Sequence, residues 1–208
     1  MIDTALLLLQ SELQNFINKV DGSGTVIVEN IGMLETSNST NLNNNIIISL
    51  VNVEEESALK NQAAVKRPFI SSSATYQNPP VYLNLYVLFT CNFSGAYPDA
   101  LKRLGYVIQF LQSKNLFSAS SSPALPDSGS GAAGFDLSNT DIASLKFTLE
   151  LYTLTFEQIN HLWGSLGGRQ VPFVMYKLRL VSISDRSVLR QVPLIEEIET
   201  NVDVIAKN

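Results

Sequence analysis

The segment from Val81 to Phe93 constrains the fold more than any other part of this sequence. Its odd-numbered positions are all apolar, and its even-numbered positions are Tyr82, Asn84, Tyr86, Leu88, Thr90 and Asn92. Apolar side chains that recur every second residue are typical of a β-strand. Because the second face is amphipathic and carries no charge, we expect this strand to lie inside a sheet that is at least half covered on both faces.

Four other segments predict strands. Residues 145–152 alternate in the same way, and the apolar or β-branched composition of the other three favours extended structure. They are Thr25–Val28, Ile46–Val53 and Val174–Ile183. The segment 57–79 has no convincing period and is interpreted as a long arm or loop, whereas the residues from Leu194 to Ile205 alternate loosely and are expected to pair as an edge or reach a neighbouring subunit.

Three segments have the three-to-four-residue spacing of amphipathic helices. The first is expected to begin at Asp3 or Thr4 and run to about Val20, and Leu7 and Leu8 make its apolar stripe wider than one core face needs.

The second helix has Pro98 in its first turn, which suits a helix start. Four apolar residues, flanked by Ala100 and Val107, predict its buried stripe: Leu101, Leu104, Ile108 and Leu111. Four polar residues are expected to face outward: Lys102, Arg103, Gln109 and Gln112.

In the third helix Thr155 and Gln158 form a capping-box pattern, and Gly167-Gly168 ends the helix. Its predicted apolar stripe is Phe156, Ile159, Trp163 and Leu166.

Strands and helices alternate here without the regular spacing of a doubly wound sheet. The sequence therefore predicts an α+β fold class, a single domain with a mixed, mainly antiparallel sheet flanked by helices. A chain of 208 residues is long enough to bury about 70% of its unfolded surface without disulfides or metal. The segments 35–45 and 117–135 are rich in Ser, Asn, Gly or Ala and are expected to be loops, the second flexible unless a partner orders it.

The charge pattern argues against several classes of partner. Fourteen Lys and Arg against nineteen Asp and Glu give a net charge of −5, and no basic run exceeds a pair such as Lys66-Arg67. This pattern disfavours nucleic acid. The N-terminus lacks the basic start of a signal peptide, and no apolar stretch reaches the roughly 18 to 20 residues of a membrane span. We therefore expect a soluble protein that is made in the cytoplasm.

The low proportion of charged residues points to subunit contacts. Only 16% of the residues are charged, which leaves less ionic surface than is usual for this size. One economical explanation is that much of the surface faces other subunits.

The residues that could carry chemistry are few. His161 is the only histidine, and its spacing from Glu157 suits an ion pair or hydrogen bond on a helix surface. Cys91 is the only cysteine, and its place on the apolar side of a central strand is typical of a small buried residue rather than a nucleophile. One His and one Cys are too few ligands for a transition-metal site.

Two further motifs are interpreted as structural features and not as functional sites. The run Gly164-Ser165-Leu166-Gly167-Gly168 closes a helix instead of opening one, so it is not a phosphate cradle, and it is not a Gly-x-Ser-x-Gly elbow between a strand and a helix. The acidic clusters 54–56 and 196–197 lack the ligand spacing of a calcium loop and are expected to be solvated strand ends. The sequence thus predicts no catalytic, cofactor-binding or metal-binding residue, and a protein that is not an enzyme.

Two long stretches resemble a known family. One is Pro79-Pro80-Val81 through Thr90, continuing to Gln109-Phe110-Leu111-Gln112. The other begins at Phe147-Thr148-Leu149 and runs through Asn160-His161-Leu162-Trp163-Gly164 to Gly168. Together they are similar to the N-terminal domain of the cap, or tail terminator, proteins of phage-tail-like contractile injection systems. The resemblance covers most of residues 1–190, so we expect residues 1–190 to form a cap domain and residues 191–208 a strand-like, interface-forming tail.

The resemblance implies a structural protein without a cofactor. Members of the family are expected to form a homo-hexamer that closes the end of the inner tube distal to the baseplate, to contact the sheath protein, and to help set particle length. Such a protein would be cytoplasmic during assembly and part of an injection particle that can be released outside the cell.

Two other functions remain as alternatives. A small-molecule-binding or enzymatic domain would need a polar pocket with titratable groups, and the sequence shows no cluster for one. A membrane-associated adaptor would need a basic amphipathic helix, which no segment provides.

Overall fold

The computed structural model describes residues 1–22, 24–34, 42–60, 65–66, 73–93, 95–122, 140–183 and 188–193. The helices are α1 (Ile2–Val20), α2 (Tyr97–Ser113), α3 (Thr140–Ala143) and α4 (Phe156–Ser165), with short 3-10 turns η1 (Ile31–Met33), η3 (Ser57–Leu59) and η4 (Ala119–Ser121). The strands are β1 (Thr25–Val28), β2 (Asn45–Glu55), β3 (Val65–Lys66), β4 (Ser73–Gln77), β5 (Val81–Asn92), β6 (Leu116–Ser118), β7 (Lys146–Leu151), β8 (Phe173–Ile183) and β9 (Val188–Pro193).

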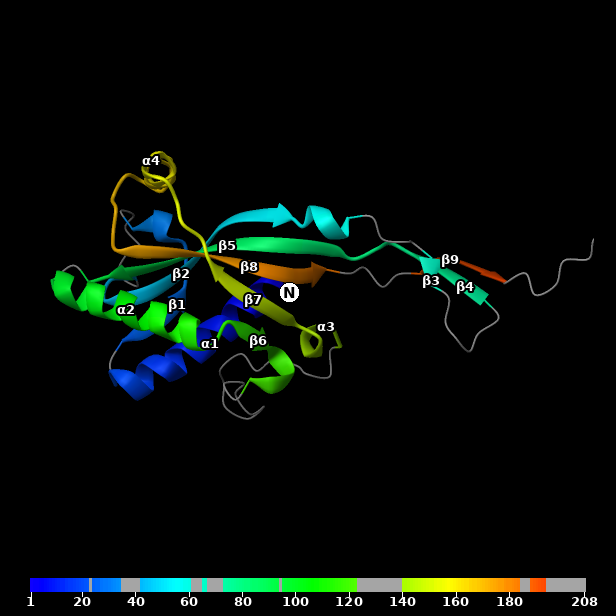
Figure 1. The fold of residues 1–208 in the computed structure, drawn as a ribbon, viewed down its shortest axis with the longest axis horizontal. Coiled ribbons are helices and arrows are strands. Elements are labelled where there is room, and N and C mark those ends of the chain that lie inside the picture. Colours follow the sequence, from blue (N-terminus) through cyan, green and yellow to red (C-terminus); the bar gives the residue numbers. More distant parts are fainter. Residues whose placement is uncertain are drawn as a thin grey trace, which may run out of the picture.

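A six-stranded sheet in the order β1-β2-β5-β8-β7-β6 forms the body of the molecule (Figure 1). Only β1 and β2 run parallel, and the other neighbours are antiparallel. The structure therefore confirms the α+β fold class with a mixed, mainly antiparallel sheet. The alternating segment that begins at Val81 becomes β5, which lies inside the sheet between β2 and β8, as its two uncharged faces predict.

A second sheet was not predicted. Strands β3, β4 and β9 form three antiparallel strands that project from one end of the main sheet as an arm (Figure 1). The arm continues the β5–β8 pair outward, because Val81 pairs with Ile183 in the main sheet and Gln77 pairs with Val188 in the arm. The segment 57–79, interpreted as an arm or loop, thus supplies η3 and two strands. Tyr76 of β4 is 39% exposed.

One face of the main sheet, called here the helix face, packs against α1 and α2. Its core joins residues of β2, β5 and β8 to both helices: Phe89, Leu85, Ile46, Leu9, Leu13 and Val107 are among its fully buried members. Eight of the nineteen residues of α1 are buried, including Leu8 at 1% exposure. Leu8, which widens the apolar stripe, therefore serves the chain's own core, whereas Leu7 is only partly buried.

The orientation of α2 differs from the prediction. Its buried residues are Ala100, Val107, Phe110 and Leu111. The expected stripe residues Leu101 and Ile108 are 47% and 41% exposed, because contacts with α1 rotate the helix. Phe110 packs on Phe16, and Arg103, expected to face outward, pairs with Asp21 at 3.1 Å and is only 12% exposed.

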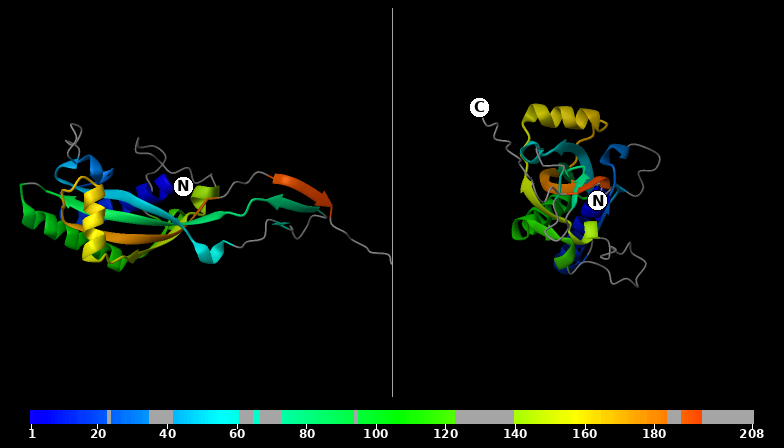
Figure 2. Two further views of the ribbon diagram at one scale, coloured as in Figure 1. Left: turned by 90° about the horizontal axis from the view of Figure 1, so that it is seen from above. Right: turned by 90° about the vertical axis from the view of Figure 1, so that its right-hand side faces the viewer.

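The other face of the sheet, called the groove face, carries α4 across one end of the body (Figure 2). Here the second core cluster joins α4 to β2, β5, β8 and η1 through Trp163, Leu88, Met175, Ile47 and Ile31. Trp163 is the one buried residue of α4. The predicted stripe is right for Trp163, while Ile159 and Leu166 are partly buried. It is wrong for Phe156, which is 88% exposed because it stands at the first turn of the helix, beyond the sheet.

The edge of the sheet at β1 is closed by side chains of α1. Gln10 donates a hydrogen bond to the backbone oxygen of Val26, and the backbone nitrogen of Val26 donates to Gln14 at 2.7 Å. The side chain of Gln14 also donates to the backbone oxygen of Gly24. At Val26 and Gly24, these bonds occupy main-chain groups that an edge strand usually leaves open.

Several predictions lie outside the described residues. The loop at 35–45 is described only from residue 42 onward, and the low-complexity segment only up to residue 122, where Phe117 and Ala119 are buried. The tail from Leu194 and the acidic pair 196–197 lie entirely outside. Described residues 188–193 form β9, which crosses the expected boundary at residue 190, and the division into 1–190 and 191–208 stays a prediction.

Candidate assembly surface

The two residues with the most reactive side chains are placed where the sequence predicts. His161 is 81% exposed on α4, and its Nε2 lies 3.8 Å from the carboxylate of Glu157 one turn earlier. Cys91 is fully buried on the helix face of β5. Burial raises the pKa of its thiol to about 12. The positive charge of nearby Arg103 has a smaller effect, which lowers this pKa. A thiol in this state is a packing residue rather than a nucleophile.

The glycine-rich run closes α4, as expected. Gly167 and Gly168 adopt φ angles of 105° and 82°, and the backbone nitrogen of Gly168 donates to the carbonyl of Trp163. Left-handed glycines at this position end a helix. The hydroxyl of Ser165 donates a hydrogen bond to the backbone carbonyl of Leu162 in the same helix. This run is therefore a helix terminus, without the exposed amides that would hold a phosphate.

The acidic cluster 54–56 is more structured than predicted. Glu56 is only 12% exposed, and its carboxylate accepts hydrogen bonds from Asn84 at 2.9 Å and from Arg179 at 3.3 Å. These contacts lower the pKa of Glu56. The hydrogen bond from Asn84 is the largest cause, and a hydrogen bond from the backbone nitrogen of Ala58 is the next largest. The expectation of a solvated strand end is thus wrong for Glu56, whose partners come from β5 and β8.

Glu54 belongs to the same polar part of the groove face. The hydroxyl of Tyr86 donates to its carboxylate at 2.6 Å, and Lys177 lies 3.6 Å away. This hydrogen bond and burial raise the pKa of Tyr86. The ring of Tyr152 meets that of Tyr86 edge-on at 5.0 Å. The groove face is therefore apolar under Trp163 and ionic toward the arm.

An open groove of about 490 Å³ runs between α4 and this part of the sheet. It is lined by Asn52, Glu54, Tyr86, Tyr152, Leu154, Gln158, His161, Leu162, Ser165 and Met175. Its size is within the range of small-molecule sites. Within this lining, however, Tyr86 donates a hydrogen bond to Glu54, His161 lies 3.8 Å from Glu157, and no nucleophile is paired with a base. The arrangement suits binding better than catalysis.

The described residues provide neither a metal site nor a membrane span. No three of their His, Cys, Asp and Glu side chains are grouped so that they could hold an ion. Within the same ranges, no helix is both long and apolar enough to cross a membrane.

Five exposed apolar side chains lie on α2, at the end of β7 and at the start of α4. This lateral patch, defined by Tyr97, Leu101 and Ile108 of α2, Leu151 of β7 and Phe156 of α4, has exposures between 41% and 88%. The right-hand view of Figure 2 shows α2 and β7 on one side of the molecule, with β1 and η1 on the other. Sequence reasoning missed the patch because it assigned three of these five residues, Leu101, Ile108 and Phe156, to apolar helix stripes. Clustered exposed apolar residues of this kind mark contact surfaces.

Comparison with solved structures finds the same fold in two assembly proteins. One is the sheath/tube terminator of the PVC extracellular contractile injection system in its extended state, with a TM-score of 0.62 and 12% identity over 100% of this chain. The other is the tube-terminating cap of the anti-feeding prophage, with a TM-score of 0.60 and 15% identity over 97% of this chain. The chain spans 65% and 61% of the lengths of these two proteins, respectively.

Sequence comparison gives the family directly. No curated protein sequence matches the chain. The Pvc16 N-terminal domain family, in contrast, matches residues 4–197, which include both core clusters and the helices, main sheet and arm. The chain therefore belongs to the Pvc16 N-terminal domain family, as the resemblance to contractile-injection cap proteins predicts.

Proposed function

We propose that this chain is a structural cap that terminates the inner tube and sheath of a contractile injection system. It acts as a homo-hexameric ring at the end of the tube distal to the baseplate, binds the tube and sheath proteins, and helps to set particle length. The observation that carries the proposal is the family match over residues 4–197, together with a fold shared along the whole chain with two terminators.

The surface chemistry supports a binding role over an enzymatic one. The lateral patch offers apolar contact area, and the arm offers two further edges, β3 and β9. Cys91 lies in the core, Ser165 bonds within α4, and His161 is an exposed side chain 3.8 Å from the exposed carboxylate of Glu157. Interfaces with several partners need such separate surfaces, because each contact in a ring or stack uses a different patch. On this proposal the protein is cytoplasmic during assembly and travels with the particle.

The test is the length distribution of particles made with and without this chain. Electron microscopy of particles from cells lacking it should show tubes or sheaths of irregular length, and supply of the chain in trans should restore a narrow distribution. Antibody labelling of intact particles should mark one end only. Particles of normal length in cells lacking the chain, or intact particles from wild-type cells that carry no label, would refute the proposal.

A second candidate function is small-molecule binding in the groove beside α4, which its volume of about 490 Å³ favours. A bound ligand would stabilise the folded chain and raise its Tm. A screen of metabolites by thermal shift, repeated on a Met175→Trp variant that fills the groove floor, tests this. A saturable shift in the wild-type chain that the variant loses would support ligand binding alongside or instead of the cap role.

A further inference from the structure

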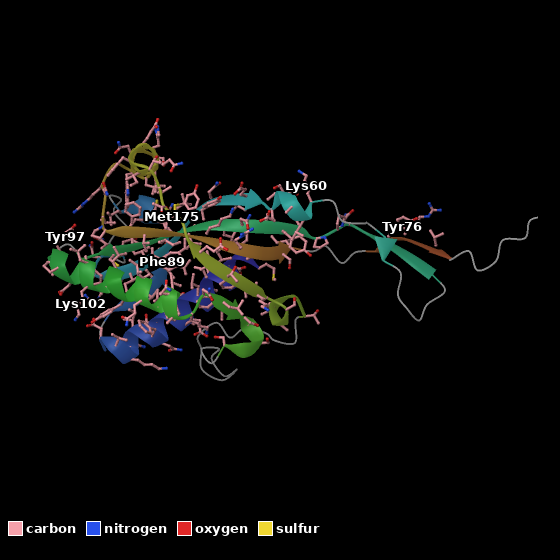
Figure 3. All side chains as sticks on the ribbon, viewed as in Figure 1. Lys60, Tyr76, Phe89, Tyr97, Lys102 and Met175 are labelled. Carbon is pink, nitrogen blue, oxygen red and sulfur yellow. The ribbon has the colours of Figure 1, made fainter. Side chains whose placement is uncertain are left out.

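One flank of α2 is apolar, exposed and free of charge. At 100° per residue, Tyr97, Leu101 and Ile108 fall within about 40° of one another around the helix axis. Their exposures are 64%, 47% and 41%, and Gly105 lies beside them. Tyr97 stands at the end of the helix furthest from the arm (Figure 3). Of the exposed charges of α2, Asp99 lies on the other side of the helix, and Lys102 lies about 100° from Leu101 and about 60° from Gly105 around the axis.

No contact within the described part of the chain explains Gly105. It lies in the interior of a 17-residue helix, where glycine is less favourable than alanine because it loses more backbone freedom on folding. A Cβ atom added there would meet nothing within 4 Å. Among the residues that the structure describes, no neighbour therefore requires the missing side chain. Glycine on a helix surface also allows another backbone to approach closely, which would account for it.

The direction of this flank follows from the contacts on its opposite side. Phe110 packs on Phe16 of α1, and Arg103 and Lys102 both pair with Asp21 at the end of that helix. The flank with Gly105 consequently points away from α1, toward the side of the body where β7 lies (Figure 2). Leu151, at the end of β7 on that side, is 60% exposed.

We infer that a second copy of this chain packs against the lateral patch, with Gly105 at the point of closest approach. The inference rests on the proposed ring and names one of its two contact surfaces. The exposed parts of Tyr97, Leu101, Ile108 and Leu151 amount to on the order of 400 Å², about half of the roughly 800 Å² that one partner contributes to a standard interface. The absence of charge on the flank fits the centre of such an interface.

A head-to-tail ring explains why the patch occupies one side only. In a closed head-to-tail ring, each subunit uses two different surfaces. The lateral patch of one copy must therefore contact the opposite side of the next copy. That opposite side here is formed by β1, the end of α1 and η1, where Val20 and Met33 are 45% and 46% exposed. A two-fold contact would instead pair the lateral patch with itself.

The experiment compares two matched glycine variants of the full chain, Gly105→Ala and Gly164→Ala. Both glycines lie in helices, and an added Cβ meets nothing within 4 Å at either. Each variant should raise the folding equilibrium constant of the isolated chain by up to about fivefold, measured by denaturant titration. In sedimentation velocity over a concentration series, Gly105→Ala should weaken self-association about tenfold or more, whereas Gly164→Ala should leave it unchanged.

Leu101→Ser provides an independent variant, because Leu101 is exposed and its loss leaves the core intact. It should also weaken self-association. A wild-type chain that stays monomeric, or a Gly105→Ala chain that associates like wild type, would overturn the inference. So would a variant that self-associates normally but no longer binds tube or sheath protein, because the patch would then belong to another partner. Correct location of the variants on particles would leave the cap function standing in each of these cases.

Discussion

The two faces of the main sheet bury very different numbers of helix residues. On the helix face, α1 alone buries eight residues, and α2 adds four more around the fully buried Phe89. On the groove face, α4 buries only Trp163, leaves Phe156 88% exposed, and borders an open groove of about 490 Å³. The same strands thus contact a fully buried core on one face and a partly exposed layer on the other.

This difference indicates which face stabilises the fold and which face is free to contact a partner. Hydrophobic stabilisation follows the apolar area removed from water, so the helix face supplies most of the folding free energy. The groove face adds ionic contacts such as that of Arg179 with Glu56, which contribute less. Elements with few buried contacts open first, so α4 is the part of the body most free to adjust to a partner.

The largest expected effect is on the helix face. Phe89→Ala removes a fully buried ring that packs edge-on against Tyr176 at 5.7 Å. The cavity and the lost transfer free energy should lower the free energy of unfolding by about 3–5 kcal/mol. Urea denaturation followed by circular dichroism measures this. A loss under about 1 kcal/mol would mean that the helix face is not the main source of stability.

On the groove face, Trp163→Ala should cost less, about 2 kcal/mol, because α4 can detach locally without unfolding the sheet. Trp163 holds α4 to the sheet through Phe173, with ring centroids 5.4 Å apart. Hydrogen exchange should show loss of protection confined to residues 156–165. Equal loss of protection in α1 would show that the two faces fold as one unit and would break the comparison.

The ionic part of the groove face should show itself in the pH dependence of stability. The pKa of Glu56 is lowered in the folded state from 4.5, mainly by Asn84, so its contribution is present above that value and is lost as pH falls through the folded pKa. Denaturation of wild type and Glu56→Gln should therefore differ at pH 7 and converge at low pH. Glu55→Gln is the control, since Glu55 is 44% exposed and pairs with exposed Lys60.

The smallest expected effect is the reactivity of Cys91, which should be near zero in the native chain. Burial raises the pKa of this thiol to about 12, so at pH 7.5 both protonation and inaccessibility prevent attack on a thiol reagent. Labelling should proceed at the rate at which the helix face opens, and it should accelerate in Phe89→Ala but not in Trp163→Ala. Rapid labelling of the native wild-type chain would contradict this account of the helix face.

The sequence predicts the parts of the fold that depend on local pattern. The alternation of β5, the capping box at Thr155 and the glycine end of α4 all require only neighbouring residues, and the structure contains each of them. The network of Glu56 could not be predicted in this way, because Arg179 lies 123 residues further along the chain. Three consecutive glutamates look solvated until the fold brings a cation beside one of them.

The rotation of α2 shows a second limit. Its sequence offers two overlapping apolar stripes, one through Ala100, Val107 and Leu111 and one through Leu101 and Ile108. Only the first faces the core. Periodicity reports that a side chain avoids water and does not report whether its own chain or another covers it. An exposed apolar surface on a helix therefore has the same sequence pattern as a stripe buried in the core, and the lateral patch was missed for that reason.

The glutamines that lie over β1 have a consequence for how large an assembly can become. With Gln10 and Gln14 bound to the main chain of Val26 and Gly24, a foreign strand would have to break three existing hydrogen bonds before it could align there. The edge at β1 is thus a poor template for pairing with a further strand. Growth by runaway β-pairing is blocked on that flank, so a chain proposed to halt the elongation of a tube also resists becoming the seed of a fibre.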